Sequence, residues 1–595
     1  MNKSGMLHDL VDACALREPA APAVVHDGHT TTYAELVTQS HLLTEDLREQ
    51  GVGAEHVVAL DLPVGPRMIA AMLAAGRLEA AFLPLDRRDP RARTEALLAD
   101  AAPAAVVTAD GYAAPGRPPR RIEDRLSPVD SPAAYLSYTS GSTGEPKGVV
   151  TEQGAIVNYV RAAIAEYGLT ASDRQLQLSS IAFDIAMDEV FSTLGSGAAL
   201  VLRDQDFLFE DAETFLGLTA RHALSVLNLP SGLWNQLGHM LRQQPALRLP
   251  ESLRLMVVGG EAASPEANAA WHAAATNPRF RIVNAYGPTE AAVSVTFGEL
   301  TATGAVTIGR PIPHVRVEPV DEHLRPVPVG EVGELLITGL APARGYLDRP
   351  EQTAARFGLI NGTRYYRTGD LGRVGDDGLL EFHGRIDSQV KVRGGFRVEP
   401  GEVAGTLLSH SEVAAAEVVP VSAASGRVLA AIVVPAHTDA PPSALELRDH
   451  LAGRLPDYMV PASFTMVERI PLTPRGKVDT AALTALIDTR TPQPADPAGE
   501  VQEQTGDAAE PDAAAVERAA RESWQLALGY EPEDPDADFF EDGGDSLAAV
   551  ALLRLLRERL GYALPLRSLY RAPRFEDMVR ELVELAGAQN EGAGR

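Results

Sequence analysis

One stretch decides the fold of this chain: Tyr138-Thr139-Ser140-Gly141-Ser142-Thr143-Gly144-Glu145-Pro146-Lys147-Gly148. Its three glycines let the backbone bend tightly and approach a ligand closely. Successive backbone N–H groups in such a bend bind anionic oxygens, and the lysine adds positive charge. Apolar residues at 133–136 and 149–150 predict strands on either side. The stretch therefore predicts a strand–loop–strand structure that holds phosphate.

This stretch is not a Walker A loop. In that motif the first glycine is followed by four residues and then Gly-Lys, whereas Pro146 stands where the second glycine is needed. Short glycine-rich motifs also occur in mobile loops that bind nothing. The function therefore has to be established from the other motifs of the chain.

Length and composition narrow the possible classes of protein. The chain has 595 residues, which is too long for one hydrophobic core and predicts about two to four domains. Its net charge of −28 argues against a general affinity for nucleic acid or an anionic membrane. Cys14 is the only cysteine, which excludes an intrachain disulfide and fits a reducing cytoplasm. No apolar signal core and no bilayer-spanning apolar run is found.

Residues 1–386 alternate short β-branched runs with amphipathic helical stretches, which predicts a large layered α/β core. A helix is predicted over 68–81, and Leu36, Leu43 and Leu47 mark another. The predicted buried strands lie at 57–60, 104–108, 198–202, 224–227 and 255–258.

Three further segments follow this core. A smaller α+β segment is predicted over 387–488, where residues 389–393 alternate polar and apolar side chains as a half-exposed strand does. Residues 489–512 are rich in Pro, Ala, Glu, Gln and Gly, lack periodicity and predict a flexible linker. Apolar residues three or four apart then predict an all-α helical bundle over 513–587, followed by a tail over 588–595.

The order of the motifs is more specific than any one of them. Residues 538–547, Asp-Phe-Phe-Glu-Asp-Gly-Gly-Asp-Ser-Leu, resemble the attachment motif of a peptidyl carrier protein. Together the motifs resemble an adenylation–thiolation didomain of a nonribosomal peptide synthetase, over nearly the whole chain. The motifs upstream of the carrier occur in the order found in adenylate-forming enzymes: 138–148, 284–290, 333–335, 366–370, 384–394 and 474–479.

This resemblance implies that ATP and Mg²⁺ are cofactors. An amino acid carboxylate attacks the α-phosphate of ATP, and because two anions repel each other the site needs cations and fixed donors. Around the nucleoside, the resemblance places Asn284 and Tyr286 at the adenine, Asp370 at the ribose hydroxyls and Arg385 near the ribose or the phosphates. The phosphates would be held by Thr139, Ser140, Gly141, Ser142, Thr143, Gly144 and Lys147.

Three residues are expected at the reacting groups. Lys477 would bridge the substrate carboxylate and the α-phosphate, whereas outside the family's final motif it would be taken for a surface lysine. Thr289 would contact phosphate and Glu290 would bind Mg²⁺. Asp387 matches the hinge about which the small domain turns after adenylation, and an ordinary turn aspartate is the alternative.

Ser546 is the expected attachment site of 4′-phosphopantetheine. It precedes an amphipathic helix, so an N-cap serine is the simpler alternative. The resemblance implies that the thiol of the attached arm attacks the acyl-adenylate and forms a thioester. The linker would hold the carrier at an effective concentration of about the millimolar range. A phosphopantetheinyl transferase is therefore an expected partner.

The resemblance also locates the amino acid substrate. Asp184 would hold its α-ammonium group, and Asp188 adds a second carboxylate that needs a partner when buried. Small residues leave room for a long side chain, so we expect a basic amino acid. A hydroxylated side chain such as that of tyrosine, or an ion pair of Asp188 with a protein cation, are the alternatives. The predicted substrate-binding positions are Asp184, Ile185, Asp188, Gly232, Val257, Gly259, Ala285, Val293 and Ser294.

The expected function is activation of an amino acid as aminoacyl-AMP and its transfer to the chain's own carrier. An aryl or fatty acyl ligase with a fused carrier is one alternative, but its substrate would leave Asp184 unpaired. A non-catalytic carrier scaffold is another, but it predicts lost loop or lysine residues, and none is lost. A separate downstream tailoring or condensation enzyme is an expected partner. Whether an MbtH-like helper protein is needed stays open.

Overall fold

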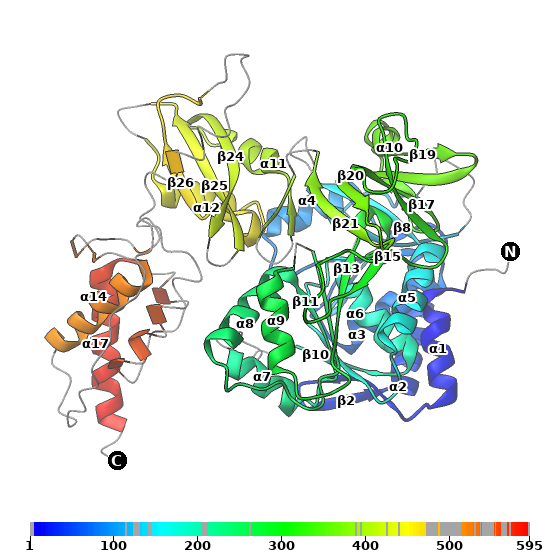
Figure 1. Cartoon of the computed structure of the whole chain (residues 1–595), viewed down its shortest axis with the longest axis horizontal. Coiled ribbons are helices and arrows are strands. Elements are labelled where there is room, and N and C mark those ends of the chain that lie inside the picture. The colour runs from blue at the N-terminus through cyan, green and yellow to red at the C-terminus, as the bar shows by residue number, and fades with distance from the viewer. Residues whose placement is uncertain are drawn as a thin grey trace. The chain divides into compact units, whose positions relative to one another are not determined.

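The computed structural model forms two compact units, one of residues 1–403 and 452–459 and one of residues 404–451 and 460–595 (Figure 1). Each unit is treated by itself below. The structure describes residues 5–113, 116–122, 131–140, 146–203, 212–260, 263–386, 389–392, 396–423, 426–437 and 441–471, and, with interruptions, parts of 483–487, 513–539, 552–569 and 573–592.

The first unit contains a nine-stranded sheet whose central strands are parallel and whose edge strands β2, β14 and β15 are antiparallel. Helices α7 (Ala212–Arg221), α8 (Ser231–Gln243) and α9 (Pro265–Ala274) pack on one face through Trp234 and Trp271. Figure 1 shows α8 and α9 side by side. The strands, in sheet order, are β15 (Arg310–Pro311), β14 (Thr296–Glu299), β13 (Arg281–Tyr286), β12 (Leu255–Gly259), β11 (Val226–Pro230), β9 (Arg174–Gln177), β10 (Ala199–Leu202), β1 (Pro22–His26) and β2 (His29–Thr32).

A seven-stranded sheet carries the glycine-rich stretch. Its central strand β3 is buried on both faces, because Val58 and Leu60 join the main core while Val57 and Ala59 join a second cluster with α4 (Arg91–Ala101). Such double burial explains the continuous apolar run in the sequence. The strands, in sheet order, are β18 (Gly345–Tyr346), β8 (Lys147–Glu152), β7 (Ala133–Thr139), β4 (Ala81–Pro84), β3 (Val57–Asp61), β5 (Ala105–Thr108) and β6 (Gly111–Ala113).

The main core lies among the helices between these sheets. It combines apolar side chains from both sheets with those of five helices, which are α1 (Leu7–Arg17), α2 (Tyr33–Glu49), α3 (Pro66–Arg77), α5 (Gln153–Tyr167) and α6 (Ile185–Ser196). Thr32 caps α2 by accepting a hydrogen bond from the backbone N–H of Glu35, whose carboxylate accepts from the Thr32 N–H in return. This capping box fixes where the helix begins.

A five-stranded antiparallel sheet and a two-stranded hairpin complete the first unit. The sheet contains β16 (Val315–Val320), β17 (Gly333–Gly339), β20 (Thr363–Val374), β19 (Phe357–Ile360) and β21 (Leu380–Arg385). The hairpin pairs β22 (Val390–Val392) with β23 (Phe396–Val398). The shorter helices are α10 (Pro350–Arg356) and the 3₁₀ turns η1 (Thr289–Ala291) and η2 (Asp457–Met459).

The second unit holds a three-stranded sheet and a separate helical core. The sheet orders β24 (Val413–Ala423), β25 (Gly426–Pro435) and β26 (Ser463–Met466), and α11 (Pro400–Leu408) and α12 (Ala444–Ala452) flank these strands in the chain. Helices α14 (Ala513–Leu528) and α17 (Phe575–Gly592) share a second core, in which Trp524 packs edge-on against Phe539 and Phe575. Val516, Ala520 and Trp524, which are four residues apart, form one buried face of α14, as the spacing of apolar residues in this segment predicts.

Two predicted element boundaries are wrong. The helix predicted over 68–81 ends at Arg77, because Glu79 takes a left-handed backbone conformation (φ 54°) and the chain enters β4 at Ala81. The strand predicted at 224–227 lies at Val226–Pro230. A run of alanines and leucines does not by itself separate a buried helix from a buried strand. Within the ranges given above, every helix is too short or too polar to cross a lipid bilayer.

Candidate functional site

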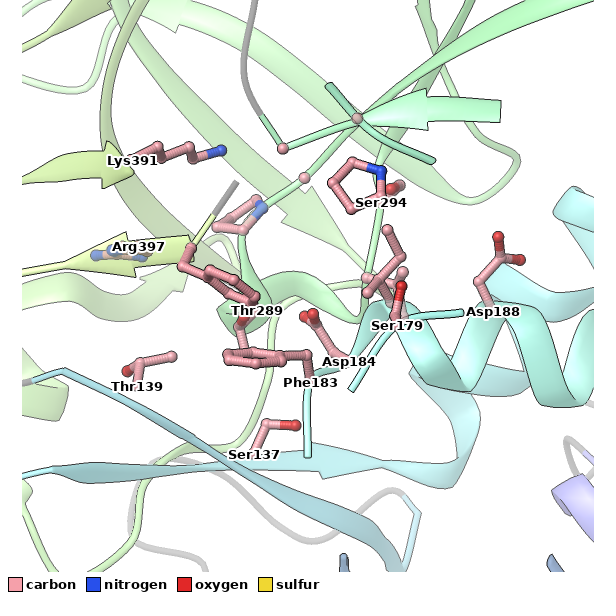
Figure 2. A pocket seen from close by; sticks show the side chains of 18 of the residues that line it. Ser137, Thr139, Ser179, Phe183, Asp184, Asp188, Thr289, Ser294, Lys391 and Arg397 are labelled. Carbon is pink, nitrogen blue, oxygen red and sulfur yellow. The ribbon is translucent and has the colours of Figure 1, made fainter. Parts of the chain in front are cut away.

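A cavity in the first unit collects most of the predicted site residues that the structure describes. It lies beyond the carboxyl ends of parallel strands β11, β12 and β13, which is the usual place for a ligand in such sheets. Figure 2 shows Lys391 and Arg397 on the β22–β23 hairpin at one end of the cavity and Asp188 on α6 at the other end. The cavity is therefore cationic at one end and acidic at the other.

The two strands predicted on either side of the glycine-rich loop are present. Strands β7 and β8 pair antiparallel, with Tyr138 opposite Gly148 and Thr139 opposite Lys147. Thr139 and Ser140 line the cavity, and the buried Thr139 hydroxyl has no hydrogen-bond partner among the residues that the structure describes. A buried donor left unpaired in this way marks a position that a ligand can satisfy. The loop residues Gly141, Ser142, Thr143 and Gly144 lie outside the described part of the chain.

A buried ion cluster surrounds Glu290. Its carboxylate accepts hydrogen bonds from Arg397 at 3.0 Å and from the Tyr346 hydroxyl at 2.8 Å, and the Lys147 ammonium lies 3.9 Å away. Burial alone would raise the pKa of Glu290, but the charges of Arg397 and Lys147 outweigh it and lower this pKa to about 2. Burial also lowers the pKa of Lys147, against the attraction of Glu290. Glu290 is therefore an ionised carboxylate that requires cations.

This cluster suits both metal and phosphate. Mg²⁺ prefers carboxylate oxygens as ligands, and Glu290 is a fully buried, ionised carboxylate. The guanidinium of Arg397 already places one positive charge beside it. Lys391 and Arg397 line the cavity and Lys147 lies 3.9 Å from Glu290, so these cations would attract phosphate oxygens. The residues present thus fit ATP with Mg²⁺, and Glu290 is the carboxylate that would hold the metal.

Tyr286, Asp370 and Arg385 form a second connected group. The antiparallel register of β20 and β21 places Asp370 opposite Arg385, and the two side chains form an ion pair. Tyr286, at the end of β13, donates a hydrogen bond of 2.6 Å to the other oxygen of Asp370. Asn284 lies two residues earlier on β13, where its amide donates to the Thr307 carbonyl. Asp370 and Arg385 line the cavity, whereas Asn284 is held away from it.

The start of α6 places two carboxylates on one wall. Asp184 is the residue before the helix and Asp188 follows four positions later, so both occupy the same helix face. Burial raises the pKa of each to about 6, although a hydrogen bond from Thr289 opposes this rise at Asp184. One carboxylate oxygen of Asp184, Oδ2, has no hydrogen-bond partner in the described structure.

The predicted substrate positions divide into two sets. Asp184, Ile185, Asp188, Gly259, Ala285, Val293 and Ser294 line the cavity. Val257 is buried in the main core and Gly232 lies near the start of α8, and neither lines the cavity. Gly259 is required by close packing, because a Cβ there would lie 2.6 Å from the Ala285 carbonyl oxygen. Lys477, Asp387 and Ser546 lie outside the described residues, and their predicted roles stay predictions.

Sequence reasoning missed several residues that the structure brings to the cavity. Phe183, Phe396 and Tyr458 form an aromatic cluster on its wall, with ring centroids 4.3 to 5.7 Å apart. Arg397 lies in the short strand β23, where the sequence pattern does not distinguish it from an ordinary exposed arginine. Its functional position is recognised only from its contact with Glu290. Phe183 had one available signal, since it directly precedes Asp184.

Comparison with known proteins agrees with this site. The model of the AMP-binding enzyme family matches residues 11–130 and 121–347, which is more than half of the chain. The chain belongs to the AMP-binding enzyme family. The C-terminal domain of AMP-binding enzymes matches residues 402–477, and the phosphopantetheine attachment site matches residues 518–582. This AMP-binding enzyme is therefore an adenylation–thiolation didomain, using ATP with Mg²⁺ and carrying 4′-phosphopantetheine.

Several relatives align with nearly the whole of this chain. Novobiocin biosynthesis protein H of Streptomyces niveus is 35% identical over 97% of this chain and 96% of its own length. A linear gramicidin synthase of Brevibacillus parabrevis is 35% identical over 98% of this chain. The AMP-binding enzyme spans only 7% of that relative, and also 7% of a probable non-canonical nonribosomal peptide synthetase, CymA, of Salinispora arenicola.

Solved structures show the same fold. An NRPS protein containing adenylation and PCP domains superposes with a TM-score of 0.76, over 97% of this chain and 96% of that chain, at 24% identity. The amide bond synthetase McbA of Marinactinospora thermotolerans gives a TM-score of 0.69 at 26% identity, over 81% of this chain and 99% of that chain. The α/β adenylation core predicted from the sequence is thus confirmed.

Proposed function

We propose that this chain activates an amino acid as aminoacyl-AMP and loads it onto its own carrier domain. The observation that carries this proposal is Asp184, a buried carboxylate on the cavity wall whose Oδ2 lacks a hydrogen-bond partner in the described structure. An α-ammonium group would satisfy it. An aryl or fatty acid lacks this cation, so binding it would leave a buried charge uncompensated.

The proposed adenylation step brings the carboxylate of the amino acid to the α-phosphate of ATP inside the cavity. An oxygen of the substrate carboxylate attacks the α-phosphorus of ATP, and pyrophosphate leaves with the electron pair of the broken P–O bond. Thr139, Ser140 and Lys147 would bind phosphate oxygens, together with Gly141, Ser142, Thr143 and Gly144 of the loop. Because the substrate carboxylate is an anion, the cations at this end lower the electrostatic cost of its approach.

The remaining nucleotide contacts are proposed from the same geometry. Tyr286 would lie against the adenine, with Asn284 behind it, and Asp370 would accept from the ribose hydroxyls. Asp370 has lone pairs beyond those used by Tyr286 and Arg385, so it can accept further hydrogen bonds. Lys477 would join the α-phosphate and the substrate carboxylate, and Thr289 would contact phosphate from η1.

Transfer to the carrier would follow on Ser546. The phosphopantetheine arm supplies a thiol, which displaces AMP from the activated carboxyl group. Asp387 would be the hinge that exchanges Lys477 for the incoming arm. The carrier requires a phosphopantetheinyl transferase to install the arm and a condensation partner to accept the product. Co-expression tests whether an MbtH-like protein is needed for soluble, active enzyme.

Substrate-dependent exchange of pyrophosphate into ATP tests the proposal. Exchange with one amino acid, and none with aryl or fatty acids, is the expected result. Exchange with an aryl acid alone would assign a ligase of the other kind. No exchange with any acid, from protein that binds ATP, would favour a carrier scaffold. A matched Asp184→Ala variant should lose exchange with the amino acid while keeping its affinity for ATP.

A further inference from the structure

The acidic end of the cavity, at Asp188, is completed by residues that the sequence analysis did not single out. Asn228, on β11, donates a hydrogen bond of 2.8 Å from its amide nitrogen to Oδ2 of Asp188. The Tyr167 hydroxyl donates to the same oxygen at 3.3 Å, and the Tyr159 hydroxyl lies 3.5 Å from that of Tyr167. Three neutral side chains from α5 and β11 therefore fix the orientation of Asp188.

Two acceptor atoms at this end have no donor. Oδ1 of Asp188 and Oδ1 of Asn228 are both buried and make no hydrogen bond in the part of the chain that the structure describes. The two side chains are 1% and 3% exposed, and both line the cavity. Buried polar atoms in proteins are nearly always hydrogen-bonded, so a pair of unsatisfied acceptors facing one cavity indicates that a ligand supplies the donors.

The unsatisfied pair also carries a net negative charge. Every partner of Asp188 among the described residues is neutral, which argues against the alternative that a protein cation neutralises it. A buried carboxylate without a cation is costly, and a ligand cation would remove that cost. A hydroxyl group offers only one hydrogen, whereas a protonated amine or a guanidinium offers several. Two acceptors and one charge thus match a cation with at least two N–H bonds.

We infer that Asn228 is a specificity-determining residue that, together with Asp188, receives a protonated nitrogen on the substrate side chain. The substrate class is a basic amino acid such as lysine, ornithine or arginine. This inference rests on the proposed amino acid adenylation. The wall between the two ends admits such a chain, because Gly259 has no side chain and Ala285 and Ser294 have small ones.

The ionisation of the free site agrees with this inference. Burial raises the pKa of Asp188 to about 6, and the hydrogen bonds from Tyr167 and Asn228 limit the rise. At pH 7 the carboxylate is therefore mostly charged and available to a cation. No proton has to be exchanged when a protonated side chain enters.

Pairs of amino acids of equal shape test the inference on the unmodified protein. Pyrophosphate exchange is measured with lysine against norleucine and with arginine against citrulline, which keeps N–H donors but carries no charge. In at least one of the two pairs, the charged amino acid should be preferred over the neutral one by about a hundredfold or more in kcat/KM. The reason is that the neutral amino acid cannot form the buried ion pair. Robust exchange with leucine, valine or tyrosine, and none with any basic amino acid, would overturn the inference and leave the adenylation proposal standing. Failure with every amino acid would overturn both.

Two substitutions assign the role to Asn228. Asn228→Leu removes both its amide hydrogen bond to Asp188 and its free acceptor, and should reduce kcat/KM for the basic amino acid by about tenfold to a hundredfold. Asp188→Asn should reduce it further and shift the arginine-to-citrulline ratio toward citrulline. Ser294→Ala, which removes an uncharged hydroxyl from the same wall, should shift that ratio less than Asp188→Asn does. Thermal denaturation and ATP affinity show that each variant is folded. An unchanged ratio in both Asn228→Leu and Asp188→Asn would contradict the assignment.

Discussion

The guanidinium of Arg397 lies 3.0 Å from the carboxylate of Glu290, although 107 residues separate them in the chain. The pair joins the β22–β23 hairpin to the 3₁₀ turn that carries the proposed Mg²⁺ ligand. Ser140 strengthens the same junction, because its hydroxyl donates to the Arg397 carbonyl and accepts from the Glu399 N–H. Any cation that binds Glu290 must therefore share or replace the contact with Arg397.

Arg397→Ala should destabilise the free protein and make it more dependent on ligand. Removing one partner of a buried ion pair costs about 3–5 kcal/mol, and Lys147 compensates only in part. Added ATP with Mg²⁺ should narrow the difference from the unmodified protein, since the metal supplies the missing charge. Chemical denaturation with and without these ligands measures both effects. Arg397→Lys, which keeps the charge, is the control, and equal stability of Arg397→Ala and the unmodified protein would disprove the prediction.

Lys477→Ala should impair adenylation with little effect on folding. Removing one group that stabilises developing charge costs about 10²–10³ in rate. Thioester formation from a supplied aminoacyl-adenylate should fall much less, because Lys477 is proposed to leave the site before that step. The two half-reactions are measured separately by pyrophosphate exchange and by loading of the carrier. An equal loss in both would show that Lys477 does not alternate between steps.

Ser546→Ala should abolish covalent loading and leave adenylation intact. The hydroxyl is the proposed attachment point, and the nucleotide site is built from other residues. Intact-mass measurement after incubation with coenzyme A and a phosphopantetheinyl transferase should show the added arm on the unmodified chain and none on the variant. Pyrophosphate exchange should proceed equally in both. A pantetheine-sized mass gain on the variant would place the attachment site elsewhere.

Binding of the amino acid should weaken in acid. Burial raises the pKa of Asp184 to about 6, and the negative charge of Glu290 adds to this rise. A hydrogen bond from Thr289 and the positive charge of Lys391 lower the pKa and limit the rise. A carboxyl group with a raised pKa takes up its proton as the pH falls through that value, so below pH 6 its attraction for the α-ammonium is lost. KM for the amino acid should rise up to about tenfold per pH unit there and stay flat above pH 7.

The variant Asp188→Asn separates the two acidic groups in that experiment. Burial also raises the pKa of the Asp188 carboxyl group to about 6. Because the variant lacks this group, its pH profile reports Asp184 alone. KM measured by pyrophosphate exchange between pH 5.5 and 8 provides the profile. A KM that is independent of pH across this interval would contradict a role for Asp184 in binding the ammonium group.

Local patterns of apolar residues in the sequence were sufficient to predict much of the fold. Double burial of β3 produces a continuous apolar run, and the four-residue spacing of Val516, Ala520 and Trp524 marks one buried face of α14. The position of Asp184 and Asp188 on one wall also follows from helical spacing alone. The end of α3 was not predictable in this way, because alanines suit both the buried helix and the strand that follows.

The sequence by itself determined the family, the order of its domains and the chemical types of the residues proposed to hold phosphate, ribose and amino acid. Those features depend on neighbours within a few residues of each other. The tertiary structure alone decided that Arg397 faces Glu290 and that Asn228, 40 residues away, faces Asp188. Sheet order and strand register bring such pairs together, and no spacing along the chain encodes a contact made across two separate elements. The acceptors left unsatisfied beside Asp188 therefore became visible only in the folded cavity.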